Sequence, residues 1–144
     1  DGETLRKNYK NAIKQYQKGI EEENYLISFI IATTLYEERL TICYLLLKWY
    51  ENDKNFDMEK KPTQSDIIEV DIKTKLDFIQ QKKYINNKKK NKALWISGTR
   101  NTLIHMSFHN LDNYSFELCE NTMDLFRKID EISRKIKEDL GFSR

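Results

Sequence analysis

Residues 25–50, YLISFIIATTLYEERLTICYLLLKWY, decide the fold, because they form the longest apolar stretch of the chain. The apolar side chains wrap most of a helical circumference, so the stretch predicts the longest helix, over residues 25–51. A helix that is apolar nearly all round lies at the centre of a bundle or is buried by a partner chain. Glu37, Glu38 and Arg39 interrupt the stretch at its middle, and three adjacent charges there exclude a membrane span.

The composition around this stretch favours long elements and few turns. The chain has 144 residues, which is the usual size of one domain, and only 4 glycines and 1 proline. Sandwiches and barrels need a turn signal about every 8–12 residues, and this composition excludes them. With 39% hydrophobic and 33% charged residues, the chain is typical neither of a disordered tail nor of a membrane protein. We expect a single domain over residues 1–144.

Periodic apolar residues predict four further helices. Ser65 or Asp66 is the expected cap of the third helix, Ser97-Gly98 marks a kink or interruption in the fourth, and Gly141 ends the fifth. Short connections between such helices predict an all-α fold, an antiparallel bundle of about five helices. Beside the helix over 25–51, the predicted helices cover residues 4–21, 65–82, 89–109 and 115–140, with a polar loop at 52–65.

The cysteines and the net charge bear on compartment and partners. Cys43 and Cys119 lie on apolar stretches and form no CxxC pair, so we expect free buried thiols in a reducing compartment. No apolar signal segment follows the first residues, so we expect a cytoplasmic protein, and the missing initiator methionine indicates a trimmed chain or a segment of a longer protein. With a net charge of only +2 the chain is not a polycation, so any binding of nucleic acid depends on where its basic residues gather.

The residues that carry chemistry gather in the segment 100–109, where both histidines of the chain stand four residues apart. Asn101 and His105 are one helical turn apart and share a face. Arg100 lies about 100° to one side, and its long side chain reaches the same face. An arginine, an amide and an imidazole therefore converge on one patch.

This set suits a phosphodiester. The guanidinium fork matches two phosphate oxygens, and the imidazole titrates near neutrality, so it takes or gives a proton. The amide holds an oxygen or fixes the orientation of the imidazole. No carboxylate cluster accompanies the three residues, so we predict neither a magnesium site nor a cofactor. The set permits metal-free RNA cleavage, in which a 2′-hydroxyl deprotonated by the imidazole attacks the adjacent phosphate.

Residues 100–105, RNTLIH, resemble the R-N-x-x-x-H form of the RxxxxH motif of HEPN-domain ribonucleases. Those are all-α bundles of four or five helices from toxin–antitoxin, abortive-infection and CRISPR-associated systems. The resemblance implies that Arg100 binds the scissile phosphate, that His105 is the acid or base, and that Asn101 is a polar helper. It also implies a homodimer with a composite active site, a prokaryotic defence or toxin role, and an antitoxin protein or RNA as a partner. Ser107 replaces the tyrosine that a partner nucleotidyltransferase modifies in some HEPN toxins, so we do not expect that regulation.

A dimer also follows from the reaction. Cleavage needs a base for the 2′-hydroxyl and an acid for the leaving 5′-oxygen, and one motif supplies one well-placed imidazole. A twofold axis through the patch supplies the second imidazole and a second arginine. Neighbouring arginines favour the neutral imidazole, so we expect a bell-shaped pH dependence with a base that works near pH 7.

Several side chains outside the motif are candidates for supporting roles. Charges amid apolar surface are usually paired or functional, so Glu38 is expected to orient Arg100 or His105, unless the acidic pair and Arg39 mark a solvent-facing stripe. The lysine-rich segment 82–92, with Tyr84 stacking on a base, is either an RNA path or a solvated loop. The expected RNA-binding residues are Lys88, Lys89, Lys90, Lys92 and His109, and the aromatic residues expected in the core are Tyr36, Tyr44, Trp49 and Trp95.

Two other functions stay open. A catalytically inactive HEPN-like domain would bind RNA or serve as a scaffold. His105 and His109 at i and i+4 would alternatively hold a metal, with Cys119 and Asp112 as further ligands. Neither histidine is followed by the glutamate of a zinc HExxH helix, and we predict no metal site.

Overall fold

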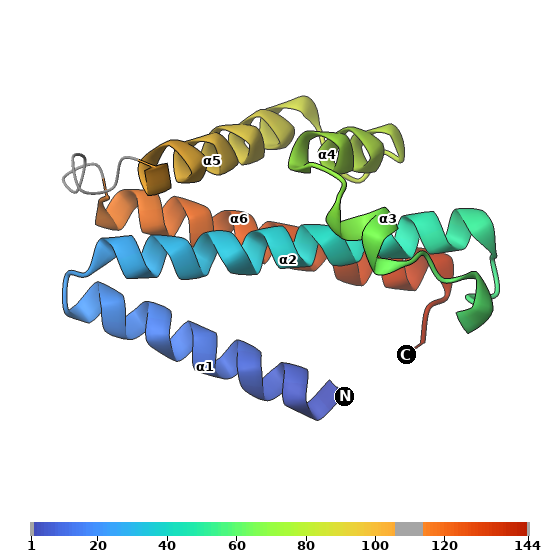
Figure 1. Cartoon of the computed structure of the whole chain (residues 1–144), viewed down its shortest axis with the longest axis horizontal. Coiled ribbons are helices and arrows are strands. Elements are labelled where there is room, and N and C mark those ends of the chain that lie inside the picture. Colours follow the sequence, from blue (N-terminus) through green and yellow to red (C-terminus); the bar gives the residue numbers. More distant parts are fainter. Residues whose placement is uncertain (1, 106–113, 144) are drawn as a thin grey trace.

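The computed structural model describes residues 2–105 and 114–143, and in these ranges the protein is all-helical (Figure 1). This confirms the predicted all-α class. Within the same ranges, no helix combines the length and the apolar character that crossing a membrane requires. The helices are α1 (Gly2–Glu21), α2 (Tyr25–Asn52), η1 (Met58–Lys60, a 3-10 helix), α3 (Gln64–Ile68), α4 (Ile72–Gln81), α5 (Asn87–His105) and α6 (Phe116–Leu140).

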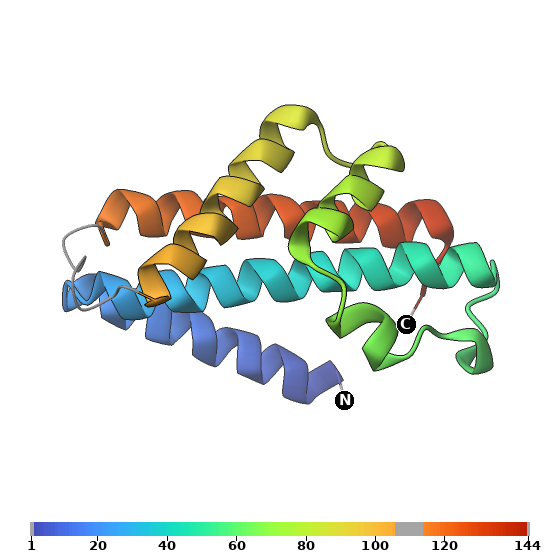
Figure 2. The same cartoon turned by 45° about the horizontal axis from the view of Figure 1, so that its top comes forward.

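The centre of the molecule is the pair α2 and α6, which lie side by side, with α1 on one side and α4 and α5 on the other (Figures 1 and 2). Long helices that follow one another in the chain alternate in direction, as short connections predict. The central pair instead runs in the same direction. Cys119 Sγ at the start of α6 donates to the Tyr25 carbonyl at the start of α2 (3.3 Å), and Phe142 beyond α6 packs on Trp49 near the end of α2 (5.9 Å between ring centroids).

The central position of α2 confirms that its apolar circumference is buried, and here the other helices of the same chain cover it. Cys43 and Cys119 are free and fully buried, as predicted. Burial raises the pKa of both thiols to about 12, so they stay protonated near neutral pH. The buried apolar residues of α2 are Phe29, Ala32, Leu35, Tyr36, Leu40, Cys43, Tyr44, Leu46, Leu47 and Trp49.

The predicted third helix is two helices, so the described ranges hold six α-helices rather than five. Thr63 caps α3 in a capping box with Asp66, and the Asp71 carboxylate accepts a hydrogen bond from the Thr74 amide (2.7 Å) and starts α4. These two N-caps, eight residues apart, begin two separate helices. The polar loop correspondingly covers 53–63 and contains η1, rather than 52–65.

The motif helix α5 is continuous through Ser97 and Gly98, so the predicted interruption is wrong. Ser97 is buried, and its hydroxyl donates to the Tyr36 hydroxyl of α2 (3.3 Å), which ties this turn to the core. The predicted end of the helix at His109 lies outside the described residues. At the other end of the chain, Gly141 ends α6 in the left-handed region (φ 69°), as predicted.

Trp95 is the exception among the aromatic residues predicted to be buried. Its side chain is 61% exposed, whereas Tyr36, Tyr44 and Trp49 are buried. Among the α5 side chains that the structure describes, Ala93, Ile96 and Ser97 are buried, and Ala93 and Ser97 contact Tyr36 of α2. Trp95 lies between them in sequence and therefore points away from the core.

A close contact at Gly19 fixes the hairpin between α1 and α2. The Ser28 hydroxyl donates to the Tyr16 carbonyl (2.7 Å), and a Cβ placed on Gly19 would overlap that hydroxyl oxygen. A Cβ on Gly98 in α5, in contrast, would meet no atom within 4 Å.

We therefore expect alanine to have opposite effects at the two glycines. Gly19→Ala forces the helices apart and lowers the free energy of unfolding by about 1–3 kcal/mol. Gly98→Ala fills open space on a helix and raises it by about 0.5–1 kcal/mol. Urea unfolding followed by circular dichroism measures both changes. Equal effects of the two substitutions would contradict the close approach of α1 and α2.

Candidate active site

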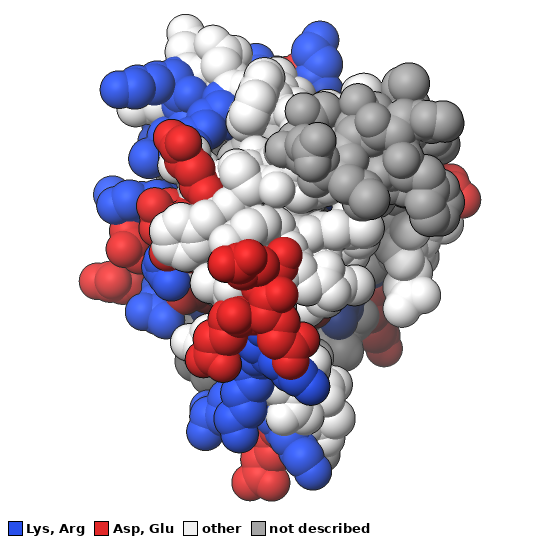
Figure 3. Space-filling view, turned by 90° about the vertical axis from the view of Figure 1, so that its left-hand side faces the viewer, with Lys and Arg blue, Asp and Glu red and all other residues white. Residues whose placement is uncertain are grey.

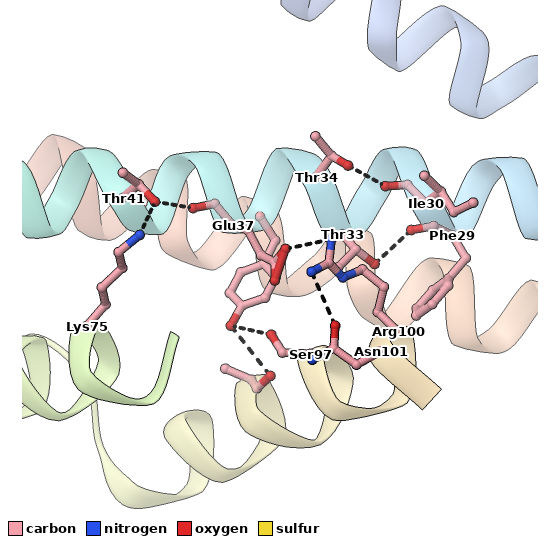
Figure 4. A network of polar contacts seen from close by, with 12 residues as sticks. Phe29, Ile30, Thr33, Thr34, Glu37, Thr41, Lys75, Ser97, Arg100 and Asn101 are labelled. Carbon is pink, nitrogen blue, oxygen red and sulfur yellow. Dashed lines mark hydrogen bonds and ion pairs between the residues drawn. The ribbon is translucent and has the colours of Figure 1, made fainter. Parts of the chain in front are cut away.

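A groove of about 730 Å³ lies between α2, α4 and α5 and holds the arginine and the amide of the predicted motif. Its floor is partly apolar, with Val70, Ile72 and Leu94 among the lining residues. Figure 4 shows the polar side chains of α2 and α5 pointing toward one another, with Lys75 of α4 reaching α2 beside them. The polar groups used below are Glu37, Thr41, Lys75, Ser97, Arg100 and Asn101.

The guanidinium of Arg100 is held by two side chains. Its Nη1 lies 3.1 Å from Glu37 Oε1, and its Nη2 donates to Asn101 Oδ1 (3.4 Å). The Glu37 and Arg100 side chains are only 15% and 29% exposed, so the ion pair is largely shielded from water. The structure thus brings Arg100 and Asn101 together and adds a carboxylate to the pair (Figure 4).

The carboxylate that orients Arg100 is Glu37 and not Glu38, which corrects the expectation from sequence. Side chains of neighbouring residues on a helix point about 100° apart, and the face of α2 that meets α5 carries Glu37. Glu38 is exposed and lies on the rim of the same groove, where it also borders a second groove between α1 and α2 near Tyr9. A role of Glu38 toward His105 stays a prediction.

Lys75 is a second cation beside Glu37. It is 4% exposed, and its ammonium donates to the Thr41 hydroxyl of α2 (2.9 Å). Burial lowers the pKa of Lys75. The negative charges of Glu37 and, to a smaller extent, Asp71 raise it and so offset part of this shift. Burial also raises the pKa of Glu37, opposed by Arg100 and Lys75. The Glu37 carboxylate therefore lies between two cations, and this end of the groove carries a net positive charge when all three groups are ionised.

The whole groove is not positively charged. Among its described lining residues, three acidic side chains balance three basic ones. The positive charge is confined to the end where Arg100 and Lys75 flank Glu37. This arrangement suits one anionic group at that end rather than a long polyanion lying in the groove. The six charged lining residues are Glu37, Glu38, Asp71, Lys73, Lys75 and Arg100.

A buried hydroxyl pair positions this end of the groove. The Tyr36 hydroxyl accepts from Ser97 and donates to the Ala93 carbonyl of α5 (3.5 Å). Burial raises the pKa of Tyr36 far above its ordinary value, so the hydroxyl stays protonated and keeps both bonds. Because Arg100 follows Ser97 by one helical turn, this contact also fixes the turn that presents the guanidinium.

His105 is the last residue of α5, and the helix is unbroken between Asn101 and His105. The two residues are therefore one turn apart, as the motif requires. The imidazole of His105 and all of His109 lie outside the described part of the structure. In the part that is described, no three histidine, cysteine or carboxylate side chains gather as metal ligands, and the metal site at the two histidines is untested.

The lysine-rich segment divides into lysines that face the protein and lysines that face solvent. Lys90 forms an ion pair with Asp77 of α4, and its ammonium also donates to Gln80 (3.1 Å). Lys89 is half-buried, whereas Lys88 and Lys92 are exposed.

Tyr84 is committed to the fold rather than free to stack on RNA. It is half-buried against the core, and its hydroxyl donates to Asp139 of α6 (2.8 Å). The solvent-facing aromatic residue close to the exposed lysines is Trp95, which the sequence analysis placed in the core.

Sequence reasoning missed Lys75 as a site residue, although its position carried a signal. It lies on the same helix face as Ile72, Leu76 and Ile79, the apolar positions of α4. A lysine at an inward position of an amphipathic helix needs a polar partner, and here it has Thr41 and the nearby Glu37. Glu37 was recognised only as one of three adjacent charges, because a one-residue choice on a helix depends on how α2 is rotated.

Comparisons of the chain with protein-family models, with curated proteins and with solved structures find no match.

Removing the Glu37 side chain tests the ion pair. Glu37→Ala leaves the Arg100 guanidinium shielded from water without its carboxylate, so we expect the free energy of unfolding to fall by about 1–3 kcal/mol. The matched control Glu38→Ala, an exposed neighbour of the same charge, should change it by less than about 0.5 kcal/mol. Chemical denaturation measures both. A larger effect at Glu38 would contradict the observed pairing.

The pH dependence of stability gives a separate test of Glu37. Its pKa is higher in the folded state than the ordinary value of 4.5, so the folded state holds this proton more tightly than the unfolded chain. The stability that the raised pKa provides is present below pH 4.5 and is lost as pH rises through the folded pKa. The free energy of unfolding of the wild type, minus that of Glu37→Gln, should therefore fall with rising pH.

Asp71→Asn is the control of opposite sign. Hydrogen bonds from Thr74 lower the pKa of Asp71 below its ordinary value of 3.8. The contribution of Asp71 is present above pH 3.8 and is lost as pH falls through the folded pKa. The difference between wild type and Asp71→Asn should therefore rise with pH, and slopes of the same sign for both variants would contradict the two environments.

Proposed function

We propose that this protein is a HEPN-like endoribonuclease that cleaves single-stranded RNA without a metal ion. The single observation that carries the proposal is the held guanidinium of Arg100, which Glu37 and Asn101 fix at the positive end of a groove. His105 follows one turn after Asn101 on the same continuous helix. An all-helical fold is also what a HEPN-like protein requires.

The charge at this end of the groove suits one phosphodiester. Arg100 and Lys75 together carry two positive charges, and Glu37 carries one negative charge when it is ionised. The sum equals the single negative charge of the linkage in magnitude and is opposite in sign. In the proposed complex, the guanidinium donates to the phosphate oxygens and stabilises the additional charge that develops on them in the transition state.

In the proposed reaction, the His105 imidazole removes the proton of the 2′-hydroxyl. The 2′-oxygen forms a bond to phosphorus, the bond from phosphorus to the 5′-oxygen breaks, and an imidazolium protonates the departing 5′-oxygen. The products are a 2′,3′-cyclic phosphate and a 5′-hydroxyl. The two proton transfers need two imidazoles, so the proposal includes a homodimer in which a second copy supplies the acid.

The biological setting belongs to the same proposal. A ribonuclease of this kind would act in the cytoplasm as a defence or toxin effector, and an antitoxin protein or RNA would hold it inactive.

A catalytically inactive HEPN-like RNA-binding or scaffold domain is the second candidate, and two observations favour it. Arg100 already has a carboxylate partner, and the described lining of the groove carries equal numbers of acidic and basic residues. A guanidinium with a permanent internal partner would stabilise the fold without binding a phosphate. The two candidates make opposite predictions for RNA incubated with the protein.

RNA digestion in the presence of EDTA tests the proposal. The wild type should cleave single-stranded RNA and leave 2′,3′-cyclic phosphate ends, with a bell-shaped dependence of rate on pH. Arg100→Ala and His105→Ala should each reduce the rate by at least about 100-fold, because one loses transition-state stabilisation and the other loses the proton acceptor. End-group analysis and gel quantification measure both.

Arg127→Ala is the matched control, and His109→Ala tests the metal site. Arg127 lies on α6, is 60% exposed and pairs with Asp124, so its loss should leave the rate unchanged. Loss of activity in His109→Ala equal to that in His105→Ala, together with bound zinc, would support the metal site instead. RNA that is bound but uncut at every pH would support the inactive domain.

A further inference from the structure

The outer face of α5 carries an aromatic side chain between the exposed lysines and the motif. Trp95 is 61% exposed, and Lys92 and Lys88 precede it by three and seven residues, so all three share one side of the helix. Both lysines are exposed. A tryptophan that is mostly exposed forgoes a large hydrophobic contribution to folding, so this position calls for another explanation.

The charge of α5 supports a polyanionic ligand on this face. The helix contains five basic and no acidic residues, although the chain as a whole has a net charge of only +2. Other surfaces differ. At the end of the molecule that holds the turn between α1 and α2, acidic and basic side chains are interspersed around an acidic cluster (Figure 3). The exposed residues 21–23 of that turn are all glutamates.

The outer face of α5 differs from the part of the lysine-rich segment whose side chains bind other residues of the protein. Lys90 is bound to Asp77 and Gln80, and Tyr84 is bound to Asp139. Lys88, Lys92 and Trp95 remain exposed on one side of the helix. These are a pair of cations one turn apart and a flat aromatic surface, the two features with which proteins hold single-stranded nucleic acid.

Gly98 connects this face to the motif. On a helical wheel, Gly98 lies about 60° from Trp95, and Asn101 lies about 60° further in the same direction. A Cβ at Gly98 would meet no atom within 4 Å, so the surface between the tryptophan and the amide is open. A strand that passes Trp95 can therefore continue past Gly98 to Asn101.

We propose that single-stranded RNA runs along the outer face of α5, with Lys88 and Lys92 contacting phosphates and a base stacked on Trp95. This inference rests on the proposed function for the nature of the ligand and assigns Trp95 to substrate binding. A second copy of the chain fits the same face less well. A twofold contact centred on Trp95 with the two α5 helices parallel would bring Lys88 and Lys92 toward the like charges of the other copy.

Trp95 itself reports the contact. The chain has two tryptophans, and Trp49 is 3% exposed, so acrylamide quenching acts mainly on Trp95. The probe is a 2′-O-methyl oligouridine of about ten nucleotides, which lacks the nucleophilic hydroxyl and cannot be cut. Saturating probe should quench the accessible tryptophan emission and protect the remainder from acrylamide. Binding that leaves Trp95 as accessible as before overturns the proposal, as does the absence of binding.

Variants separate the contributions. Trp95→Ala should weaken probe binding by about five- to a hundredfold, and Trp95→Phe should restore most of the loss. Lys88→Gln combined with Lys92→Gln should weaken binding and reduce the slope of log affinity against log salt by about 1–1.5. The matched control is Lys10→Gln with Lys14→Gln, an exposed pair on α1 with the same spacing and the same charge change, which should leave both unchanged. Equal losses from the two lysine pairs overturn the path along α5.

Two further outcomes distinguish this inference from the proposed function. Stacking of the uncut probe on Trp95 without cleavage of ordinary RNA supports the inference and contradicts the ribonuclease. Cleavage in EDTA with unchanged activity and probe binding in Trp95→Ala supports the ribonuclease and overturns the inference. Protection of Trp95 that depends on protein concentration and not on the probe identifies a dimer contact and also overturns it.

Discussion

The burial of α2 from all sides is the constraint on which the rest of the structure depends. An apolar helix of this length needs cover along its whole circumference, and α1, α6 and the pair α4 and α5 provide it. The cover places α5 across α2 at the point where α2 carries three adjacent charged residues. The Glu37 carboxylate is then shielded from water, and a shielded charge needs a cation beside it. Arg100 of α5 and Lys75 of α4 are the cations at that point.

The cluster of Glu37, Lys75 and Arg100 is better explained by its effect on the position of the guanidinium than by a contribution to stability. Burial raises the pKa of Glu37 and lowers that of Lys75, so desolvation outweighs the mutual attraction for both groups. A buried ion pair of this kind contributes little net free energy compared with apolar packing, but it costs much to break. It therefore fixes the guanidinium on one side of α5. The Ser97 and Tyr36 hydroxyls fix the preceding turn of the same helix.

The sequence predicted the helices well and their contacts less well. Apolar spacing predicted α1, α2 and α6 to within about two residues, and Gly141 marked the last end correctly. The split between α3 and α4 was missed because the second cap, Asp71, lies within an apolar period that continues past it. The parallel course of α2 and α6 depends on the path of the chain through α5, which local periodicity does not encode. The pairing of Arg100 with Glu37 rather than Glu38 depends on how α2 is rotated about its axis, and the exposure of Trp95 depends on the rotation of α5. The sequence does not determine this rotation for an apolar helix or for a weakly amphipathic one.

The rotation of α5 gives its faces separate tasks. The inner face, with Ala93, Ile96 and Ser97, secures the helix to the core, and Arg100 extends from it into the groove. Lys88, Lys92 and Trp95 face outward, where nothing in the described structure competes for them. A strand bound on the outer face would reach Asn101 from solvent, while the guanidinium approaches the same residue from the groove. Binding and chemistry would then meet at one turn of one helix, and a groove without net charge would not itself have to hold the whole polyanion.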